Sequence, residues 1–408
     1  MTDTTTAGTD QAPGGVPTAR ISPFDPSPEL ARLRETRPVS RMTFPDGHLG
    51  WLVTSHAGVR AVLADNRFSS RADLARAPIA GPRLDQRLPE IPPGLFNRMD
   101  EPEHTKYRRL LTGQFTVRRM NQLVPRIERI TEEHLDAIEN AGPPADLVET
   151  FARPIPSLVI CELLGVPYTD REEFQRDSAV LFNLSSKPED AMNAWMSLRR
   201  FLGALVRAKQ VAPDDDLLSG LVAGGELTEE ELITIGMVLL IAGHETTAKM
   251  LALGTFALLR HPDQLVLLRA DPTLINGAVE ELMRYLTIIH IGPVRTALED
   301  VELDGHLVKA GDSVALSLPA ADRDPAKFTD PDRLDVTRSA QGHVGFGHGI
   351  HQCLGQQLAR IEMRVGYSAL FRRFPTLCLA IPAEEVPMGT DMAIYGVHRL
   401  PVTWEVNQ

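Results

Sequence analysis

Apolar residues recur every three to four positions through most of the stretch from 102 to about 286. The segments 128–139, 156–164 and 191–209 carry this spacing most clearly. Such spacing places the apolar side chains on one face of a helix, which is then buried against a neighbour. The pattern therefore predicts a core built mainly from packed helices.

One predicted helix stands out by its length. Thr228 and Glu231 have the spacing of a capping box, and an apolar run follows directly. No proline interrupts the pattern before Pro262, so the helix can span about 30 residues, or about 45 Å. Its middle is apolar on nearly every face, which predicts a helix that runs through the centre of the molecule.

Strand patterns are confined to short segments, most of them late in the chain. Residues 301–303 and 306–309 flank Asp304-Gly305, a hairpin signal. Further strands are expected at 50–55, 314–318 and 400–405, a short helix at 28–35 and a long loop at 75–93. The pattern along the chain therefore predicts one mainly α domain with a minor β portion.

The composition excludes some classes of function and supports a folded protein. The formal net charge of −12 argues against nucleic-acid binding, and 43% hydrophobic with 24% charged residues is ordinary for a folded protein. A length of 408 residues suggests several domains. No linker is visible, however, so we expect a disordered tail over 1–20 and one domain over 21–408.

The cysteine count and the N-terminus bear on location. Three cysteines cannot form a disulfide framework, which favours a reducing compartment. The N-terminus has no apolar core of a secretory signal, and the longest apolar run, 232–242, is short of a membrane span. We expect a cytoplasmic protein.

A glycine-rich loop around one cysteine is the first chemical candidate. Gly345, Gly347, Gly349 and Gly355 surround Cys353, and an amphipathic helix follows. A cysteine at a helix N-terminus is favoured as the thiolate. Other interpretations are a small buried hydrophobe, a nucleotide-binding loop, or a zinc site with the nearby histidines at 348 and 351.

An acid beside a hydroxyl in the middle of the long helix is the second candidate. Glu245 and Thr246 interrupt an apolar surface, and buried polar groups are costly unless they are satisfied. Alternatively, the Thr246 hydroxyl bonds back to the carbonyl four residues earlier. Gly243 removes a side chain where a ligand could approach.

Two further pairs of charged residues are weak evidence for a functional site on their own. Glu281 and Arg284 stand at i and i+3 on a helix, where ion pairs are common and weak. His104 and Arg108 stand at i and i+4 after Asp100-Glu101-Pro102, and cations suit the carboxylates of a ligand.

Together these motifs resemble the cytochrome P450 family, of the soluble actinobacterial type. Phe346, Gly349, His351, Cys353 and Gly355 match every fixed position of that family's haem-binding signature. The run 242–247 is similar to its oxygen-binding groove, and 281–284 to its E-x-x-R pair. Pro331-Asp332-Arg333-Leu334 fits the segment that supplies a third ion-pair residue, while Asp322 stands where many bacterial relatives carry Asn.

The resemblance implies a cytochrome P450 fold, a helix-rich triangular prism with small β-sheets, and a thiolate-ligated haem b whose iron Cys353 binds. It implies that Glu245 and Thr246 relay protons to bound dioxygen. Glu281, Arg284 and Arg333 would be structural. The other cofactor-binding residues implied are His104, Arg108, Arg295, His351, Phe346, Ala242, Gly243, Gly347 and Gly355.

The implied activity is a monooxygenase that inserts one oxygen atom from O2 into a C–H or C=C bond. Electrons would come from an iron–sulfur ferredoxin and an NAD(P)H-dependent reductase, and we expect a monomer. A basic docking patch would include Arg108, Arg109, Arg118, Arg119, Arg360 and Arg364. The alternatives are a peroxide-using or rearranging haem-thiolate enzyme and a non-catalytic haem-binding module, although such relatives often lose the Glu-Thr pair.

The expected substrate is a bulky, largely apolar small molecule such as a polyketide, macrolide or terpenoid. In this fold it would be held by apolar side chains, of which the candidates are Leu95, Phe96, Phe182, Leu239, Ile289, Ile291 and Ile394.

Overall fold

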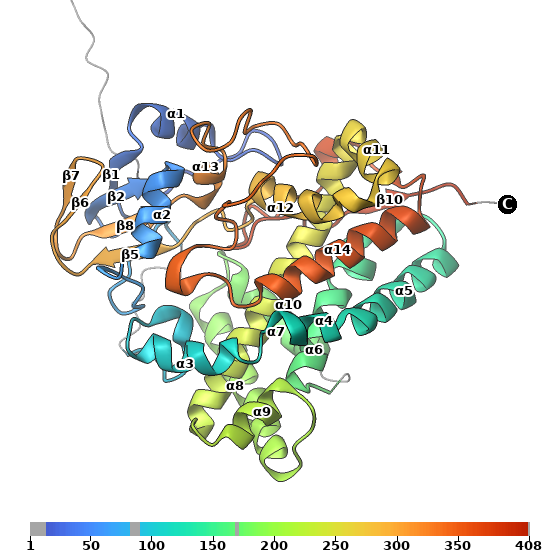
Figure 1. Cartoon of the computed structure of the whole chain (residues 1–408), viewed down its shortest axis with the longest axis horizontal. Coiled ribbons are helices and arrows are strands. Elements are labelled where there is room, and N and C mark those ends of the chain that lie inside the picture. Colours follow the sequence, from blue (N-terminus) through green and yellow to red (C-terminus); the bar gives the residue numbers. More distant parts are fainter. Residues whose placement is uncertain (1–13, 82–89, 168–170, 407–408) are drawn as a thin grey trace, which may run out of the picture.

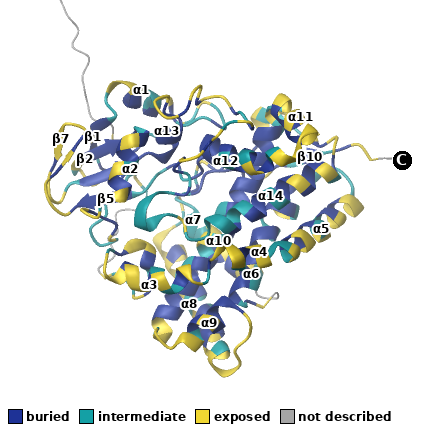
Figure 2. Ribbon diagram, in the orientation of Figure 1, coloured by how far each residue is buried: buried dark blue, intermediate teal, exposed yellow. Residues whose placement is uncertain are grey.

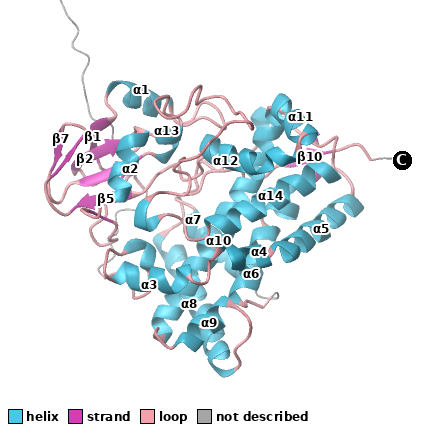
Figure 3. Ribbon diagram, viewed as in Figure 1, coloured by secondary structure: helices cyan, strands magenta, loops and turns pink. Residues whose placement is uncertain are grey.

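The computed structural model describes residues 14–81, 90–167 and 171–406. Helices make up most of it, as Figure 3 shows. The α-helices are α1 Pro28–Thr36, α2 His56–Ala64, α3 Glu103–Thr112, α4 Val117–Gln122, α5 Val124–Ala141, α6 Pro154–Leu164, α7 Arg171–Phe182, α8 Pro188–Val211, α9 Leu217–Gly224, α10 Glu229–Arg260, α11 Pro262–Ala270, α12 Ile275–Leu286, α13 Leu318–Asp322 and α14 Gln356–Arg373. Shorter helical turns are η1 Phe96–Arg98, η2 Val148–Ala152, η4 Pro272–Leu274, η5 Gly349–His351 and η6 Ala383–Glu385.

The strands form small sheets, the largest at the corner of the molecule that also holds α1, α2 and α13 (Figure 1). Its order is β1-β2-β8-β5-β3, with only the β2–β8 pair parallel. A three-stranded sheet has the order β4-β10-β9, and β6 and β7 form a hairpin. The strands are β1 Val39–Thr43, β2 Leu49–Val53, β3 Phe68–Ser69, β4 Ala145–Asp146, β5 Val294–Ala297, β6 Val301–Leu303, β7 His306–Val308, β8 Ser313–Leu316, β9 Cys378–Leu379 and β10 Pro401–Thr403.

Helix α10 is the central element. Its N-cap Thr228 accepts from the Glu231 N–H, and the Glu231 carboxylate accepts from the Thr228 N–H, which confirms the predicted capping box. The helix packs against α6, α8 and α14, and Figure 2 shows it mostly buried. None of the described helices has the length and apolar character needed to cross a membrane.

The predicted short elements are confirmed with small shifts at their ends, including the β6–β7 hairpin and strands β2, β8 and β10. At the N-terminus the description begins at Gly14. The Gly15 N–H donates to Thr43 O and Val16 is buried, so packed structure begins inside the segment expected as a tail. Residues 1–13 of that segment lie outside the described residues.

The ion pair of α12 is fully buried, and its third member differs from the prediction. Arg284 donates from Nε and Nη2 to the two Glu281 carboxylate oxygens, at 2.7 and 2.8 Å. The arginine that joins them is Arg338, whose Nε donates to Glu281 at 3.1 Å. The prediction of Arg333 is wrong, because buried Leu334 turns the Arg333 side chain outward and leaves only its carbonyl in the network.

Asp322, at the end of α13, is fully buried beside this network. It accepts from the Val344 N–H at 2.8 Å and from the Thr287 hydroxyl at 2.9 Å. Burial raises the pKa of its carboxyl to about 6, against partial opposition from His343 and these hydrogen bonds. At neutral pH the folded chain therefore carries a buried carboxylate that would be more stable in water.

Asp322→Asn is expected to stabilise the protein at pH 7 by about 1–3 kcal/mol. The amide oxygen still accepts from Val344, and the amide nitrogen can donate to Thr287, so no bond is lost. Because the folded pKa is raised, the native carboxyl costs stability as pH rises from about 4 to about 6. Urea unfolding at both ends of this range checks the prediction, which fails if the gain persists unchanged at the acidic end.

Candidate active site

A cavity of about 530 Å³ lies between α10, the loop before α14 and the start of α14. From α10 its lining residues are Val238, Leu239, Ala242, Gly243, Thr246, Thr247 and Met250. From the opposite wall they are Gly345, Phe346, Gly347, His351, Gln352, Cys353, Leu354, Gly355, Leu358, Ala359, Glu362 and Met363. The structure thus brings the two motifs with candidate chemistry to one cavity.

The loop before α14 aims Cys353 into this cavity. Its N–H donates to Phe346 O at 2.8 Å, which closes a turn through Gly347 at φ 71°. Gly349, at φ 72°, lies so near α2 that a Cβ would be 2.2 Å from Leu63 O. Glycine is required at this position for both reasons.

Cys353 sits just ahead of the N-terminus of α14. The backbone N–H groups of Gly355 and Gln356 point to its sulfur and favour the thiolate. Burial outweighs them and raises the pKa of the Cys353 thiol. A metal ion at the sulfur would reverse this balance, since a coordinating thiol is deprotonated outright.

Cationic side chains gather at one edge of the cavity. Arg98, Arg108, Arg295 and His351 line it, and the His104 ring lies tilted against the His351 ring, with the ring centroids 4.3 Å apart. Among the described residues Arg98 and Arg295 have no carboxylate partner, and both His104 ring nitrogens and His351 Nε2 are buried without a hydrogen bond. Burial and these neighbouring cations lower the pKa of His351 to about 3. Among the described residues, therefore, no ion pair offsets the charges of Arg98 and Arg295.

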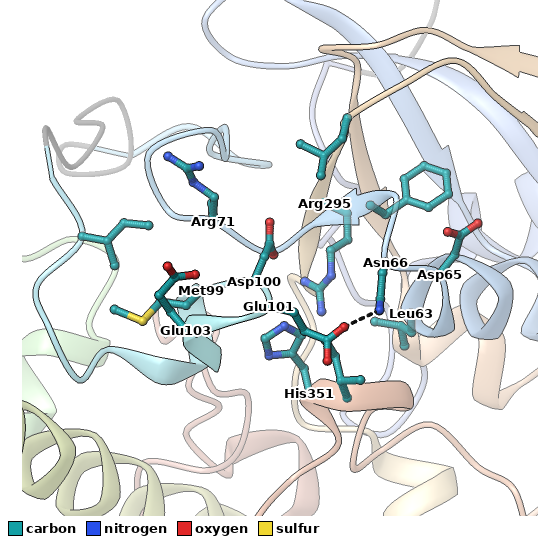
Figure 4. Close-up of a pocket in the computed structure, with 14 residues that line it drawn as sticks. Leu63, Asp65, Asn66, Arg71, Met99, Asp100, Glu101, Glu103, Arg295 and His351 are labelled. Carbon is teal, nitrogen blue, oxygen red and sulfur yellow. Dashed lines mark hydrogen bonds between the residues drawn. The ribbon is translucent and has the colours of Figure 1, made fainter. Parts of the chain in front are cut away.

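A second cavity, of about 540 Å³, adjoins the first at Arg295 and His351 (Figure 4). Its wall carries the acids Asp65, Asp100, Glu101 and Glu103 and, besides Arg295 and His351, the cation Arg71. The Glu101 carboxylate accepts from Asn66 Nδ2 at 2.7 Å. The carboxylates on this wall disfavour an anion in the second cavity, so an anion at the cationic cluster is favoured on the side of the first cavity.

On α10, Thr246 faces the cavity but bonds back into its own helix. Its hydroxyl donates to Ala242 O at 2.8 Å, as the alternative interpretation expected. Gly243 also lines the cavity, yet a Cβ there would lie 2.8 Å from Ile160 Cδ1 of α6. Glycine is needed at 243 for close packing of two helices, in addition to any ligand.

Glu245 is buried and does not line the cavity. Its Oε1 lies 3.5 Å from Nζ of Lys249, one turn later on α10. The predicted acid and hydroxyl are therefore neighbours in sequence whose side chains have different partners in the structure.

The predicted substrate residues are only partly brought together. Phe96, Leu239, Ile289 and Ile394 line the cavity, whereas Leu95, Phe182 and Ile291 do not line it. Phe115, Ile160, Val238 and Ile288 add to its apolar wall, and of these Phe115 and Ile160 were not predicted. They lie on α6, α10 and connecting segments, and only the fold shows that these meet.

Three polar residues were missed as well: Arg98, Lys249 and Glu362. Glu362 is buried in the cavity wall, Oε2 has no partner among the described residues, and burial raises the pKa of its carboxyl well above its usual range. A signal existed for it, because an acid stands between Ile361 and Met363 on a helix whose apolar face was recognised.

Comparison with known proteins identifies the family. The sequence profile of the cytochrome P450 family matches residues 197–394. Cytochrome P450 105C1 of a Streptomyces species is 52% identical over 397 residues, covering 97% of this chain and all of the relative. The chain belongs to the cytochrome P450 family, and it is a haem-thiolate monooxygenase.

Two further relatives are similar along nearly their whole length. Pentalenic acid synthase of Streptomyces avermitilis is 45% identical over 398 residues, covering 96% of this chain and 98% of the relative. The crystal structure of CYP105P1 in complex with filipin I superposes with a TM-score of 0.93 at 46% identity, covering 98% of this chain and all of the other. The fold expected from the sequence is confirmed.

The residues present fit a haem. A haem carries two propionates, and the cationic cluster is an unpaired set of donors at the cavity edge. A cysteine whose sulfur faces the cavity is the residue type that would hold the iron in this family. The unsatisfied histidine nitrogens and unpaired arginines are accounted for once two carboxylates lie among them.

Proposed function

We propose that Cys353 is the iron ligand, and that the enzyme oxygenates a bulky, largely apolar secondary metabolite. The supporting observation is that Cys353 alone of the three cysteines lines the described cavity, together with Thr246. When bound there, the haem supplies the activation of dioxygen that transfers one atom to a C–H or C=C bond.

The protein's own groups hold the haem and shape its environment. The amides of Gly355 and Gln356 face the Cys353 sulfur and stabilise its negative charge. Arg98, Arg108, Arg295, His104 and His351 bind the propionates in this proposal, and Phe346, Gly347, Ala242 and Gly243 form the flat walls. Arg98 is an addition to the set expected from the sequence.

Thr246 and Glu245 are proposed to deliver protons at the α10 wall of the cavity. Thr246 presents its hydroxyl oxygen to the cavity while its proton is held by Ala242 O. A hydroxyl in this position can accept a proton from one side and pass one on from the other. Glu245, the acid next to Thr246 in the sequence, is proposed to supply the proton that Thr246 accepts.

Thr246→Ala is expected to lower the product formed per NAD(P)H about tenfold, with the lost electrons recovered as hydrogen peroxide. The reason is that the methyl group cannot hold or pass a proton. Parallel assays of product, peroxide and NAD(P)H check this. Thr255→Ala is the matched control, since its hydroxyl makes the same 2.8 Å bond to Leu251 O outside the cavity. Fully coupled turnover in Thr246→Ala would contradict the relay.

The apolar cavity wall favours an apolar substrate, with orientation set by few polar groups. The names of the similar proteins, pentalenic acid synthase and a complex with filipin I, support a terpenoid or polyketide. Reconstituted turnover of such scaffolds with isotopically labelled dioxygen tests the function. One labelled oxygen atom in the product is expected, and unlabelled product would contradict a monooxygenase reaction.

Electrons are proposed to come from an iron–sulfur ferredoxin and an NAD(P)H-dependent reductase. The enzyme is proposed to act as a monomer in the cytoplasm, with one catalytic domain over 21–408. Of the expected docking arginines, Arg108 is turned inward to Gln352 O, and Arg360 is paired with Glu280. Arg118 and Arg109 are exposed, Arg109 with an equally exposed partner in Glu226, and these two are the better candidates.

Reversal of both charges, in Arg109→Glu/Arg118→Glu, is expected to slow reduction by ferredoxin about tenfold at low salt. The difference should shrink as salt is added, because exposed charges are screened. Stopped-flow reduction measures it. Arg32→Glu, on α1, is the control. An unchanged rate in the double variant would rule out this docking face.

A further inference from the structure

Lys249 is a buried lysine in the middle of α10. Its side chain is 7% exposed, and that of Glu245 is 8% exposed. In the part of the chain that the structure describes, Glu245 is the only carboxylate within ion-pair distance of Lys249 Nζ. A buried charge is costly unless it is paired, so the two side chains depend on each other.

The segment after η6 holds Lys249 in place. Nζ donates to Val397 O at 3.3 Å. The lysine stem lies against the bare Cα of Gly396, where a Cβ would be 2.7 Å from Lys249 Cδ and 3.1 Å from its Cβ. The Gly396 carbonyl in turn accepts from the Gly389 N–H at 2.7 Å. The ammonium group is thus fixed from outside the helix.

This arrangement fixes Glu245 on the side of α10 that adjoins the cavity-lining face. Adjacent residues on a helix point in directions about 100° apart, so Glu245 and Thr246 cannot share one face. Thr246 lines the cavity, and its hydroxyl donates to Ala242 O rather than to Glu245. A proton passed from Glu245 to Thr246 must therefore start from the position in which Lys249 holds the Glu245 side chain.

We propose that Lys249 is a positioning residue that holds the Glu245 side chain in place next to Thr246 on α10 and thereby sets how often oxygen activation ends in product. The inference rests on the proposed function of Glu245 and Thr246. Product formation takes up O2, two electrons and two protons and yields the oxygenated substrate and water. Peroxide release takes up the same O2, electrons and protons, so the position of the proton donor decides between the two outcomes.

The test is Lys249→Met, which keeps the stem and removes the charge. Without its cation the Glu245 carboxyl group loses its ion-pair partner. Infrared difference spectra of wild type against Glu245→Gln report the bands of the Glu245 carboxyl group. The comparison of Lys249→Met against Lys249→Met/Glu245→Gln should show these bands at a shifted frequency. This readout is independent of turnover.

The second readout is coupling, which is the amount of product formed per NAD(P)H consumed. Lys249→Met is expected to lower product per NAD(P)H about three- to tenfold, with peroxide rising to match. In a Glu245→Gln background the same change should alter coupling less than about twofold, because Lys249 acts through Glu245. Thr255→Val, a buried change on the same helix, controls for destabilisation.

Each result has a defined meaning. Normal coupling and unshifted carboxyl bands in Lys249→Met would overturn the proposal while Glu245→Gln remains uncoupled. Normal coupling in Glu245→Gln itself would overturn the proposed relay instead. If Lys249→Met does not fold, Gly396→Ala displaces the lysine stem without changing any charge. Uncoupling of that variant is then the expected result, and full coupling would overturn the proposal.

Discussion

Cys353→Ala is expected to abolish monooxygenase activity and the thiolate-type carbon monoxide difference band of the reduced protein. The variant removes the sulfur that faces the cavity, while the turn from Phe346 to Gly349 and the cationic cluster remain. Some haem is therefore expected to be retained through its propionates, without a thiolate ligand. The spectrum and the haem content of the purified protein measure both effects.

The other two cysteines are matched controls. Cys161 is buried in α6 and Cys378 is exposed on β9, and neither lines the cavity among its described residues. Cys161→Ala and Cys378→Ala should keep the thiolate-type band. A histidine-type band in fresh wild-type protein, or an unchanged band in Cys353→Ala, would contradict ligation by Cys353.

Arg284→Met is expected to lower the free energy of unfolding by about 3–5 kcal/mol, as for other broken buried ion pairs. The change leaves the Glu281 carboxylate buried with reduced compensation. It also removes the Nη1 donor to Asp322 O and Pro331 O, both at 2.8 Å. Urea unfolding of the haem-loaded protein measures the loss.

The Arg284→Met change should also weaken haem binding. Arg284 donates to Asp322 O, and the Asp322 carboxyl group accepts from the Val344 N–H at the start of the cysteine loop. We expect less haem per chain in purified Arg284→Met. The control is Arg153→Met, whose i,i+4 pair with Glu149 is exposed and worth less than about 1 kcal/mol. Equal losses in the two variants would show that burial of the Arg284 pair is unimportant.

Features set by local sequence were predictable. The capping box at Thr228 and Glu231 fixed the start of α10, and the proline at 262 its end. The Asp304-Gly305 turn identified the β6–β7 hairpin. In each case the deciding interactions join residues a few positions apart.

Features set by distant contacts were not predictable. Arg338 rather than Arg333 joins the buried pair because the chain turns at Leu334, which the core holds. Gly243 faces Ile160 of another helix, and Lys249 is held by residues about 150 positions later. A motif names residue types in order, but it does not state which side chain each of them meets.

The unpaired cations at the cavity edge have a consequence for how the protein matures. Burial, and after it repulsion from Arg98, lowers the pKa of Arg295 to about 10 in the folded chain, and an anion bound beside the two arginines acts as their counter-ion. Haem binding supplies that counter-ion to the native state only, so it is linked to folding. The haem then acts as a folding ligand, and the thermal midpoint should rise with haem saturation. Cells short of haem would accumulate a less stable chain, so that haem supply limits the amount of enzyme as well as its activity.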